Sequence, residues 1–122
     1  MTAFKVLIVD DSLITVKKLT ALLEGLGHRV VGTAGTGGTA VEAYRRHAPD
    51  LVTMDITMPD MDGVEATARI VGEFPEARIV MVTSHGQERM VIDALDAGAR
   101  GYVLKPVRPE KLAEMIDKVM AR

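Results

Sequence analysis

The pattern of apolar residues along the chain predicts five short strands, each followed by a segment of helical length. Runs of strand length that are rich in β-branched residues occupy positions 5–10, 29–34, 51–55, 78–83 and 101–104. The first, third and fourth of these runs (VLIVD, LVTMD and IVMVT) are almost continuously apolar. Such runs are typical of parallel strands that are covered on both faces. The pattern therefore predicts an α/β fold with a doubly wound, mostly parallel (βα)₅ sheet.

The segments between the predicted strands are amphipathic. Leucines at positions 19, 22, 23 and 26 share one face of the first predicted helix, and the last predicted helix repeats apolar residues from Leu112 at helical spacing. Glycine and proline residues stand at the breaks between elements. The sequence contains no linker, repeat or low-complexity stretch. We therefore expect residues 1–122 to form a single domain with no output domain attached.

Composition and charge narrow the classes of function. A chain of 122 residues has room for one core, and 48% hydrophobic with 26% charged residues is the composition of an ordinary globular protein. A formal net charge of −2 predicts no binding to nucleic acid or to an anionic membrane. The absence of cysteine excludes disulfides and thiolate metal sites. The first apolar run is too short for a signal peptide, so we expect a cytoplasmic protein.

Polar and charged residues follow four of the five predicted strands. Asp10 and Asp11 end the first run, Asp55 ends the third, Thr83 ends the fourth, and Lys105 follows the fifth. In open α/β sheets, ligands bind outside the carboxyl ends of the strands, where the strand order reverses. We therefore expect three carboxylates, a hydroxyl and an amine to meet at one edge of the sheet.

This set of residues favours phosphoryl chemistry that depends on a metal ion. Two unit charges about 4 Å apart interact by roughly 4 kcal/mol at an effective dielectric near 20, so three close carboxylates require a cation. Oxygen ligands without histidine or cysteine suit Mg²⁺, which often binds carboxylates together with phosphate oxygens. One carboxylate could then attack phosphorus while the other groups stabilise the charge. Asp55 is the best placed nucleophile.

Several motifs give the chain a clear resemblance to a known family. VDDS at the end of the first run, MDITMPDMDG around Asp55, Thr83, and LKP at the end of the fifth run resemble the receiver domain of response regulators. The resemblance spans the whole chain. It implies a flavodoxin-like strand order of 2-1-3-4-5 and phosphorylation of Asp55 by a histidine kinase, with Mg²⁺ as the cofactor.

The resemblance also implies a role for individual residues around the phosphoacceptor. Asp10 or Asp11 would ligate the metal ion, together with Asp55 and the backbone carbonyl of Thr57. Lys105 would pair with the phosphoryl group.

The same resemblance implies a switch and a shaped loop. Thr83 would donate a hydrogen bond to a phosphoryl oxygen, and Tyr102 would be the switch aromatic that changes rotamer with it. A cis peptide bond before Pro106 would shape the loop of the preceding lysine. The signal would leave through a surface on the fourth and fifth strands and the helices that follow them.

Within the family, the chain is most similar to stand-alone, CheY-type regulators. Thr57 and His85 depart from the enteric CheY pattern, so we expect them to tune the lifetime of the phosphoryl group. We expect a monomer before phosphorylation and a partner such as a flagellar motor switch protein, with a kinase or another regulator as the next candidate. Such a protein would lose its phosphoryl group slowly without being a turnover enzyme. The alternative is a single-domain phosphorelay regulator outside chemotaxis.

Parts of the sequence are also compatible with three other functions, which are dinucleotide binding, phosphatase activity and metal-independent protein interaction. Residues 35–40 read G-x-G-x-x-A, as in dinucleotide-binding domains, although this fingerprint normally follows the first strand rather than the second. The structural alternative is a flexible loop that needs glycine dihedral angles. A phosphatase with an aspartyl nucleophile would also use an acidic strand end and Mg²⁺, but its D-x-D motif is missing. A metal-independent interaction module would not need the acidic cluster with Lys105.

Overall fold

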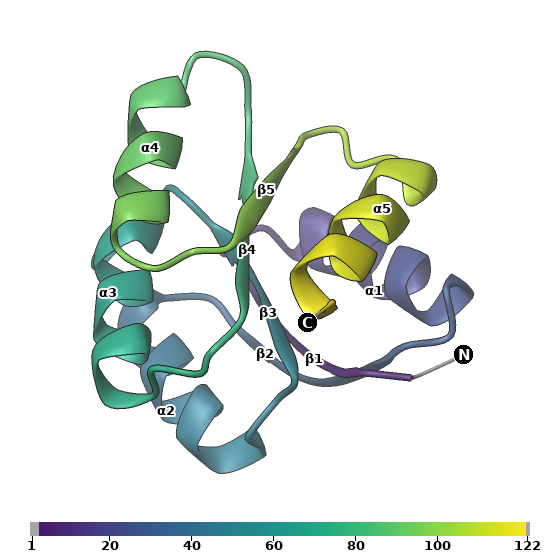
Figure 1. Cartoon of the computed structure of the whole chain (residues 1–122), viewed down its shortest axis with the longest axis horizontal. Coiled ribbons are helices and arrows are strands. Elements are labelled where there is room, and N and C mark those ends of the chain that lie inside the picture. Colours follow the sequence, from purple (N-terminus) through teal and green to yellow (C-terminus); the bar gives the residue numbers. More distant parts are fainter. Residues whose placement is uncertain (1–2, 122) are drawn as a thin grey trace.

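The computed structural model describes residues 3–121 and contains one five-stranded parallel sheet (Figure 1). The strand order is β2-β1-β3-β4-β5, which confirms the predicted 2-1-3-4-5 topology. The strands are β1 (Lys5–Val9), β2 (Arg29–Ala34), β3 (Leu51–Asp55), β4 (Ile79–Thr83) and β5 (Gly101–Leu104). The order reverses between β1 and β3, because the chain runs from β1 outward to β2 and then returns to the other side of β1.

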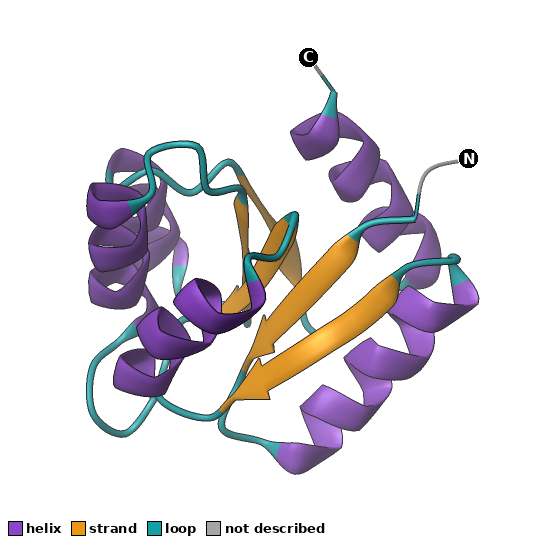
Figure 2. Ribbon diagram, turned by 90° about the horizontal axis from the view of Figure 1, so that it is seen from below, coloured by secondary structure: helices purple, strands orange, loops and turns teal. Residues whose placement is uncertain are grey.

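Five helices cover the sheet in two layers. They are α1 (Leu13–Gly25), α2 (Gly37–His47), α3 (Gly63–Glu73), α4 (Glu88–Asp96) and α5 (Pro109–Met120). Figures 1 and 2 show α2, α3 and α4 on one face of the sheet, with α1 and α5 on the other. None of the helices within residues 3–121 is long and apolar enough to cross a membrane.

Each helix layer encloses its own part of the core. Side chains from one side of β1, β2, β3 and β4 pack with α2, α3 and α4, as Met54 does beside Ile70. Side chains from the opposite side pack with α1 and α5, as Ile8 does with Leu19 and Ile116. Every residue of β3 and β4 is buried, which explains why their sequences are apolar without alternation. The fully buried strands β3 and β4 therefore end at Asp55 and Thr83, where the functional site is expected.

The predicted first strand is one residue too long. β1 ends at Val9, although the Asp10 N–H still donates to the Ala34 carbonyl at 2.9 Å. The Asp10 carboxylate accepts the Ser12 N–H at 2.8 Å, and the Ser12 hydroxyl caps α1 by accepting from the Thr15 N–H at 3.3 Å. The chain thus turns from strand to helix within three residues, and this turn holds Asp10 and Asp11 at the strand end.

The glycine-rich segment at residues 35–40 does not form the flexible loop that its sequence suggested. Within residues 3–121, the glycines with positive φ are Gly27, Gly86 and Gly98, so none lies in this segment. Thr36 instead caps α2, and Gly37 is the first residue of the helix. A Cβ atom at Gly37 would overlap Cγ of Met61. A larger residue at this position would therefore force the Met61 side chain to move, because another segment approaches closely.

Candidate functional site

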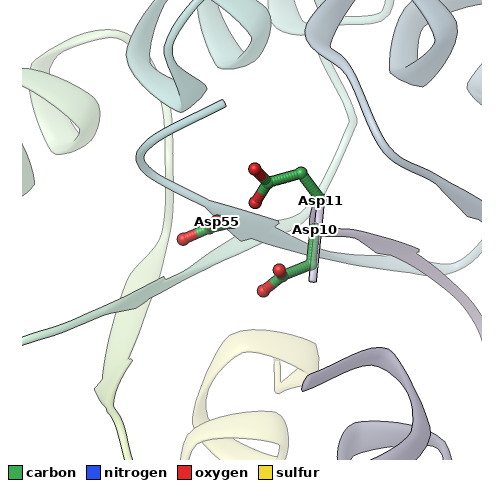
Figure 3. A group of neighbouring side chains, drawn as sticks. All are labelled: Asp10, Asp11 and Asp55. Atoms are coloured by element: carbon green, nitrogen blue, oxygen red, sulfur yellow. The ribbon is translucent and has the colours of Figure 1, made fainter. Parts of the chain in front are cut away.

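Three carboxylates meet at the ends of two neighbouring strands. Asp10 and Asp11 follow β1, and Asp55 is the last residue of β3, which pairs directly with β1. One oxygen from each carboxylate lies within 4.8 Å of the others. Figure 3 shows the three side chains side by side at the ends of these strands. The predicted acidic cluster is therefore present in the folded chain.

Two of the three carboxylates are removed from solvent. Asp10 is 3% exposed and Asp55 is 7% exposed, whereas Asp11 is exposed. The Oδ1 atom of Asp10 accepts the Ser12 N–H, but its Oδ2 atom is buried without a hydrogen bond. This atom has the ammonium group of Lys105 3.4 Å away, but a buried carboxylate oxygen that makes no hydrogen bond is costly, so it is available for an additional positive ligand.

Lys105 reaches the cluster from the loop that follows β5. Its Nζ atom lies 3.3 Å from Oδ1 of Asp55 and 3.4 Å from Oδ2 of Asp10. The Lys105 N–H donates to the Thr83 carbonyl at 2.7 Å and so holds this residue beside the end of β4. The peptide bond between Lys105 and Pro106 is cis.

The surroundings of Asp55 favour its protonated form. Burial raises the pKa of the Asp55 carboxyl above its ordinary value, and the negative charge of Asp10 raises it further. The charge and the hydrogen bond of Lys105 lower the pKa of Asp55, but the pKa remains above its ordinary value. The ammonium group of Lys105 therefore does not offset the combined effect of burial and the nearby carboxylates on the pKa of Asp55.

The cluster fits a hard divalent cation. Three carboxylates face one ammonium group, and the buried Oδ2 atom of Asp10 has no hydrogen bond. The donor set consists of oxygen atoms, which Mg²⁺ prefers over nitrogen and sulfur. An added cation would relieve the repulsion and lower the pKa of Asp55. The residues present therefore match the cofactor that the sequence predicts.

The loop between β3 and α3 is held tightly against the end of its strand. The Gly63 N–H donates to the Ile56 carbonyl at 2.6 Å, and a Cβ atom at Gly63 would overlap the Asp55 carbonyl. Asp62 caps α3 by accepting the Glu65 N–H at 2.8 Å. Glycine is thus required where the helix begins against the strand end.

Asp60 lies in this loop, and the sequence analysis assigned no role to it. Its Oδ1 atom accepts the Gly37 N–H at 2.8 Å and its Oδ2 atom accepts the Gly38 N–H at 2.9 Å. The carboxylate therefore caps the first turn of α2 and ties this helix to the loop that follows Asp55. These backbone donors, that of Gly38 first, lower the pKa of the Asp60 carboxyl.

The bonds of Asp60 also bear on the dinucleotide interpretation. In that interpretation, free N–H groups at the start of the glycine-rich helix would hold a pyrophosphate. Here the protein's own carboxylate accepts from two of them. The segment also follows β2, which lies at the edge of the sheet, away from the crevice between β1 and β3. The geometry does not favour a dinucleotide site.

Thr83 lies at the end of β4, and its hydroxyl has partners outside the acidic cluster. The side chain is 1% exposed, and its hydroxyl donates to Oε1 of Gln87 at 2.7 Å. The Gln87 side chain also contacts Thr57, as its Nε2 atom donates to the Thr57 hydroxyl at 3.0 Å. No sequence pattern predicted the contact of Gln87 with Thr57, because it depends on the path of two loops.

Tyr102 and His85 lie beside this network on the surface. Tyr102 is 43% exposed on β5, and His85 is exposed in the loop after β4. Both line a hollow between β5 and α4 that also includes Ile92 and Leu95. Tyr102 thus has its ring in an outward position in this structure.

Comparison with known proteins identifies the family. The model of the response regulator receiver domain matches residues 6–117. The chain belongs to this family. It is 44% identical to chemotaxis protein CheY of Bacillus subtilis over 97% of this chain and 98% of that protein. It is 42% identical to CheY of Thermotoga maritima over 94% of this chain and 96% of that protein.

A solved structure supports the same assignment. A chain from the crystal structure of the CheX–CheY–BeF₃–Mg²⁺ complex from Borrelia burgdorferi matches 98% of this chain and 90% of its own length, with a TM-score of 0.92 and 39% identity. The chain is therefore a CheY-like receiver domain, which is a signalling regulator rather than a conventional enzyme. This assignment argues against the two alternative functions, a phosphatase with an aspartyl nucleophile and a metal-independent interaction module.

Neutralising Asp11 in this receiver domain should weaken Mg²⁺ binding. We expect Asp11→Asn to lower the Mg²⁺ affinity by about tenfold or more, because two unit charges about 4 Å apart interact by roughly 1 to 4 kcal/mol and Mg²⁺ carries two charges. The metal-free variant should also unfold at a higher urea concentration, because the repulsion in the cluster is reduced. Titration calorimetry and urea unfolding measure these changes. Asp96→Asn, which removes the same charge at the exposed end of α4, is the control.

The carboxylate of Asp60 should stabilise the receiver domain in a pH-dependent way. Because its pKa is lowered in the folded chain, its contribution is present above the unfolded pKa of about 3.9 and is lost as the pH falls through the folded value. Asp60→Asn should therefore unfold at lower urea than the parent at pH 7. The difference in the urea concentration at which the two proteins unfold should become smaller as the pH falls and the Asp60 carboxylate of the parent is protonated.

The control for this experiment is Asp62→Asn, since asparagine is as good a helix cap as aspartate. This control should match the parent at neutral pH. A constant difference between Asp60→Asn and the parent at every pH would contradict the role of the Asp60 charge.

Proposed function

We propose that Asp55 accepts a phosphoryl group from the phosphohistidine of a histidine kinase when Mg²⁺ is bound. The observation that carries this proposal is the position of the Asp55 carboxylate, which lies in the acidic cluster and 3.3 Å from Lys105. A nucleophile, an ammonium group and a set of metal ligands thus share one edge of the sheet. Phosphoryl transfer depends mainly on such positioning and on charge stabilisation.

In the transfer, an oxygen of Asp55 forms a bond to phosphorus as the bond from phosphorus to the histidine nitrogen breaks. The released imidazole carries the electron pair of the broken bond. Lys105 places its ammonium group beside the attacking carboxylate, where it can stabilise the phosphoryl oxygens. Bound Mg²⁺ supplies positive charge that offsets the carboxylates and the incoming phosphoryl group. Its ligands would be Asp10 or Asp11, Asp55 and the backbone carbonyl of Thr57.

The acyl phosphate on Asp55 ends by hydrolysis, in which water attacks phosphorus and releases inorganic phosphate. We assign the tuning of this slow step to Thr57 and His85. Both side chains are exposed in loops that follow the strand ends, where they can orient or exclude the attacking water. The protein would regenerate its carboxylate once for each phosphoryl group received, without turning over a separate substrate.

Thr83 and Tyr102 would change conformation when Asp55 is phosphorylated. The Thr83 hydroxyl would leave its present partner and donate to a phosphoryl oxygen, and the exposed ring of Tyr102 would turn inward. Such a change needs only to shift an existing equilibrium between two conformations. A tenfold gain in partner affinity corresponds to about 1.4 kcal/mol of differential binding.

The proposed output surface lies on α4, β5 and α5. The fourth strand, which we also expected to contribute, cannot do so because every residue of β4 is buried. Ile92, Leu95, Tyr102 and Leu104 are large hydrophobic residues that are exposed on α4 and β5. The neighbouring hollow on the α5 side includes basic side chains at Arg108, Lys111 and Lys118. An amphipathic partner segment with an apolar stripe and acidic residues would fit this surface.

We propose a flagellar motor switch protein as the first partner, acting in chemotaxis, with a kinase or another regulator as the second. The support is the similarity to proteins named CheY in two bacteria. The similar chain from a CheX–CheY–BeF₃–Mg²⁺ complex supports a role in binding other proteins. We further propose that the exchange takes place in the cytoplasm and that the unphosphorylated protein is a monomer.

Acetyl phosphate should label Asp55 only in the presence of Mg²⁺. We expect intact-mass analysis to show the addition of one phosphoryl group to the parent and none to Asp55→Asn, because the amide cannot form an acyl phosphate. Chelation of the metal should abolish labelling of the parent. Lys105→Met should fold but label much more slowly, since its ammonium group is lost.

Two results would contradict this assignment. Labelling that persists in Asp55→Asn would place the acceptor elsewhere, and labelling that persists without metal would remove Mg²⁺ from the reaction. Peptide mapping of the labelled parent distinguishes Asp55 from the neighbouring carboxylates.

Partner binding should depend both on the state of Asp55 and on the output surface. Using the motor switch protein of the same organism, we expect at least tenfold tighter binding when beryllofluoride and Mg²⁺ occupy the site. Ile92→Asp should remove most of this affinity, because it places a charge in the apolar part of the surface. Binding can be measured by titration calorimetry.

The matched control for Ile92→Asp is Leu13→Asp, which places the same charge at an exposed apolar residue of α1. This control should bind the switch protein as the parent does. Equal affinity with and without beryllofluoride would show that Asp55 does not control the surface. An absence of binding in both states would favour a regulator outside chemotaxis.

A further inference from the structure

The Gln87 side chain joins the loop after β4 to the loop after β3. Its Oε1 atom accepts from the Thr83 hydroxyl at 2.7 Å and from the Ser84 N–H at 2.9 Å. Its Nε2 atom donates to the Thr57 hydroxyl at 3.0 Å. One amide thus contacts both the predicted switch residue and a predicted lifetime residue.

Hydrogen-bond chemistry fixes the orientation of this amide. The backbone N–H of Ser84 can only donate, so the atom of Gln87 that faces it must be the oxygen. That oxygen cannot donate, so the Thr83 hydroxyl must be the donor in their contact. The NH₂ group then faces Thr57, whose oxygen accepts and whose hydroxyl hydrogen remains free to point elsewhere.

The contact restrains the switch residue. The Thr83 hydroxyl has a single hydrogen, and Gln87 is its nearer acceptor, since the Ser84 carbonyl lies 3.3 Å away. A hydroxyl in this arrangement must break its bond to Gln87 before it can donate to a phosphoryl oxygen on Asp55. The side chain is only 1% exposed, so water cannot readily replace the lost partner.

The same side chain anchors the start of α4. Gln87 occupies the N-cap position, but it makes no capping hydrogen bond to the helix because its amide is used by Thr83, Ser84 and Thr57. The first turn of α4 is therefore tied to the ends of β3 and β4 through this amide. Loss of one of these bonds would loosen the helix that carries part of the proposed output surface.

We propose that Gln87 is a positioning residue that restrains Thr83 in the unphosphorylated protein and holds the hydroxyl oxygen of Thr57 in place by donating to it. This role rests on the proposed phosphorylation of Asp55. In this role, phosphorylation must break the hydrogen bond between Thr83 and Gln87, and the start of α4 is then released.

Gln87→Met tests the restraint, since it keeps the length of the side chain and removes all three hydrogen bonds. We expect the variant to bind beryllofluoride with Mg²⁺ about threefold to tenfold more tightly than the parent, which is the effect of losing one hydrogen bond on the unbound state. Its labelling by acetyl phosphate should accelerate. Titration calorimetry and intact-mass kinetics provide the two measurements.

The matched background is Thr83→Val, which has nearly the same shape and lacks the hydroxyl. In this background, Gln87→Met should not tighten beryllofluoride binding, because there is no hydroxyl to release. Equal tightening in both backgrounds would show a general loosening of the loop and would overturn the restraint. An unchanged affinity in the parent background would also overturn it.

The contact with Thr57 has its own test in the rate of dephosphorylation. We expect Gln87→Met and Thr57→Val to change this rate in the same direction, and the double variant to add little to Thr57→Val. Fully multiplicative effects would show that Gln87 does not act through Thr57. If the parent neither binds beryllofluoride nor accepts a phosphoryl group, the proposed function fails together with this role. A labelled parent with unaltered Gln87 variants overturns the role alone.

Discussion

Repulsion among the carboxylates of Asp10, Asp11 and Asp55 is the constraint on which the functional edge of this protein depends. Parallel pairing of β1 with β3 forces the three groups together, and burial strengthens their interaction. Lys105 reduces the repulsion but leaves the pKa of Asp55 raised. A chain selected only for stability would not retain such a cluster, whereas one that binds a cation and a phosphoryl group gains from it.

The loops around the cluster are held by single side chains that reach between elements. Asp60 ties the loop after β3 to the start of α2, and Gln87 ties the same loop to the start of α4. Both are polar contacts near the surface, unlike the two apolar layers that hold the sheet. The strands are thus held by buried apolar packing, whereas the loops beyond their ends are held by polar contacts that can exchange partners, as a switch requires.

The sequence predicted the fold because its apolar runs mark buried parallel strands, but the strand order came from the family resemblance. It also placed Asp10, Asp55 and Lys105 correctly, since the ends of parallel strands share one edge. Asp60 and Gln87 were missed because the bonds that join Asp60 to Gly37 and Gly38, and Gln87 to Thr57, span more than 20 positions through loops without a period. The glycines near residue 37 were explained wrongly, because a close approach by Met61 leaves no trace in local sequence.

The capping of α2 by Asp60 has a consequence for selectivity among anions. Two adjacent glycine N–H groups at a helix start are attractive to any phosphate, and this molecule has such a pair close to its reactive edge. Because the Asp60 carboxylate accepts from both N–H groups, they cannot bind a nucleotide or free phosphate. The start of α2 is therefore closed to phosphate by the chain itself, whereas the Lys105 side chain stays 28% exposed beside the carboxylates at the strand ends.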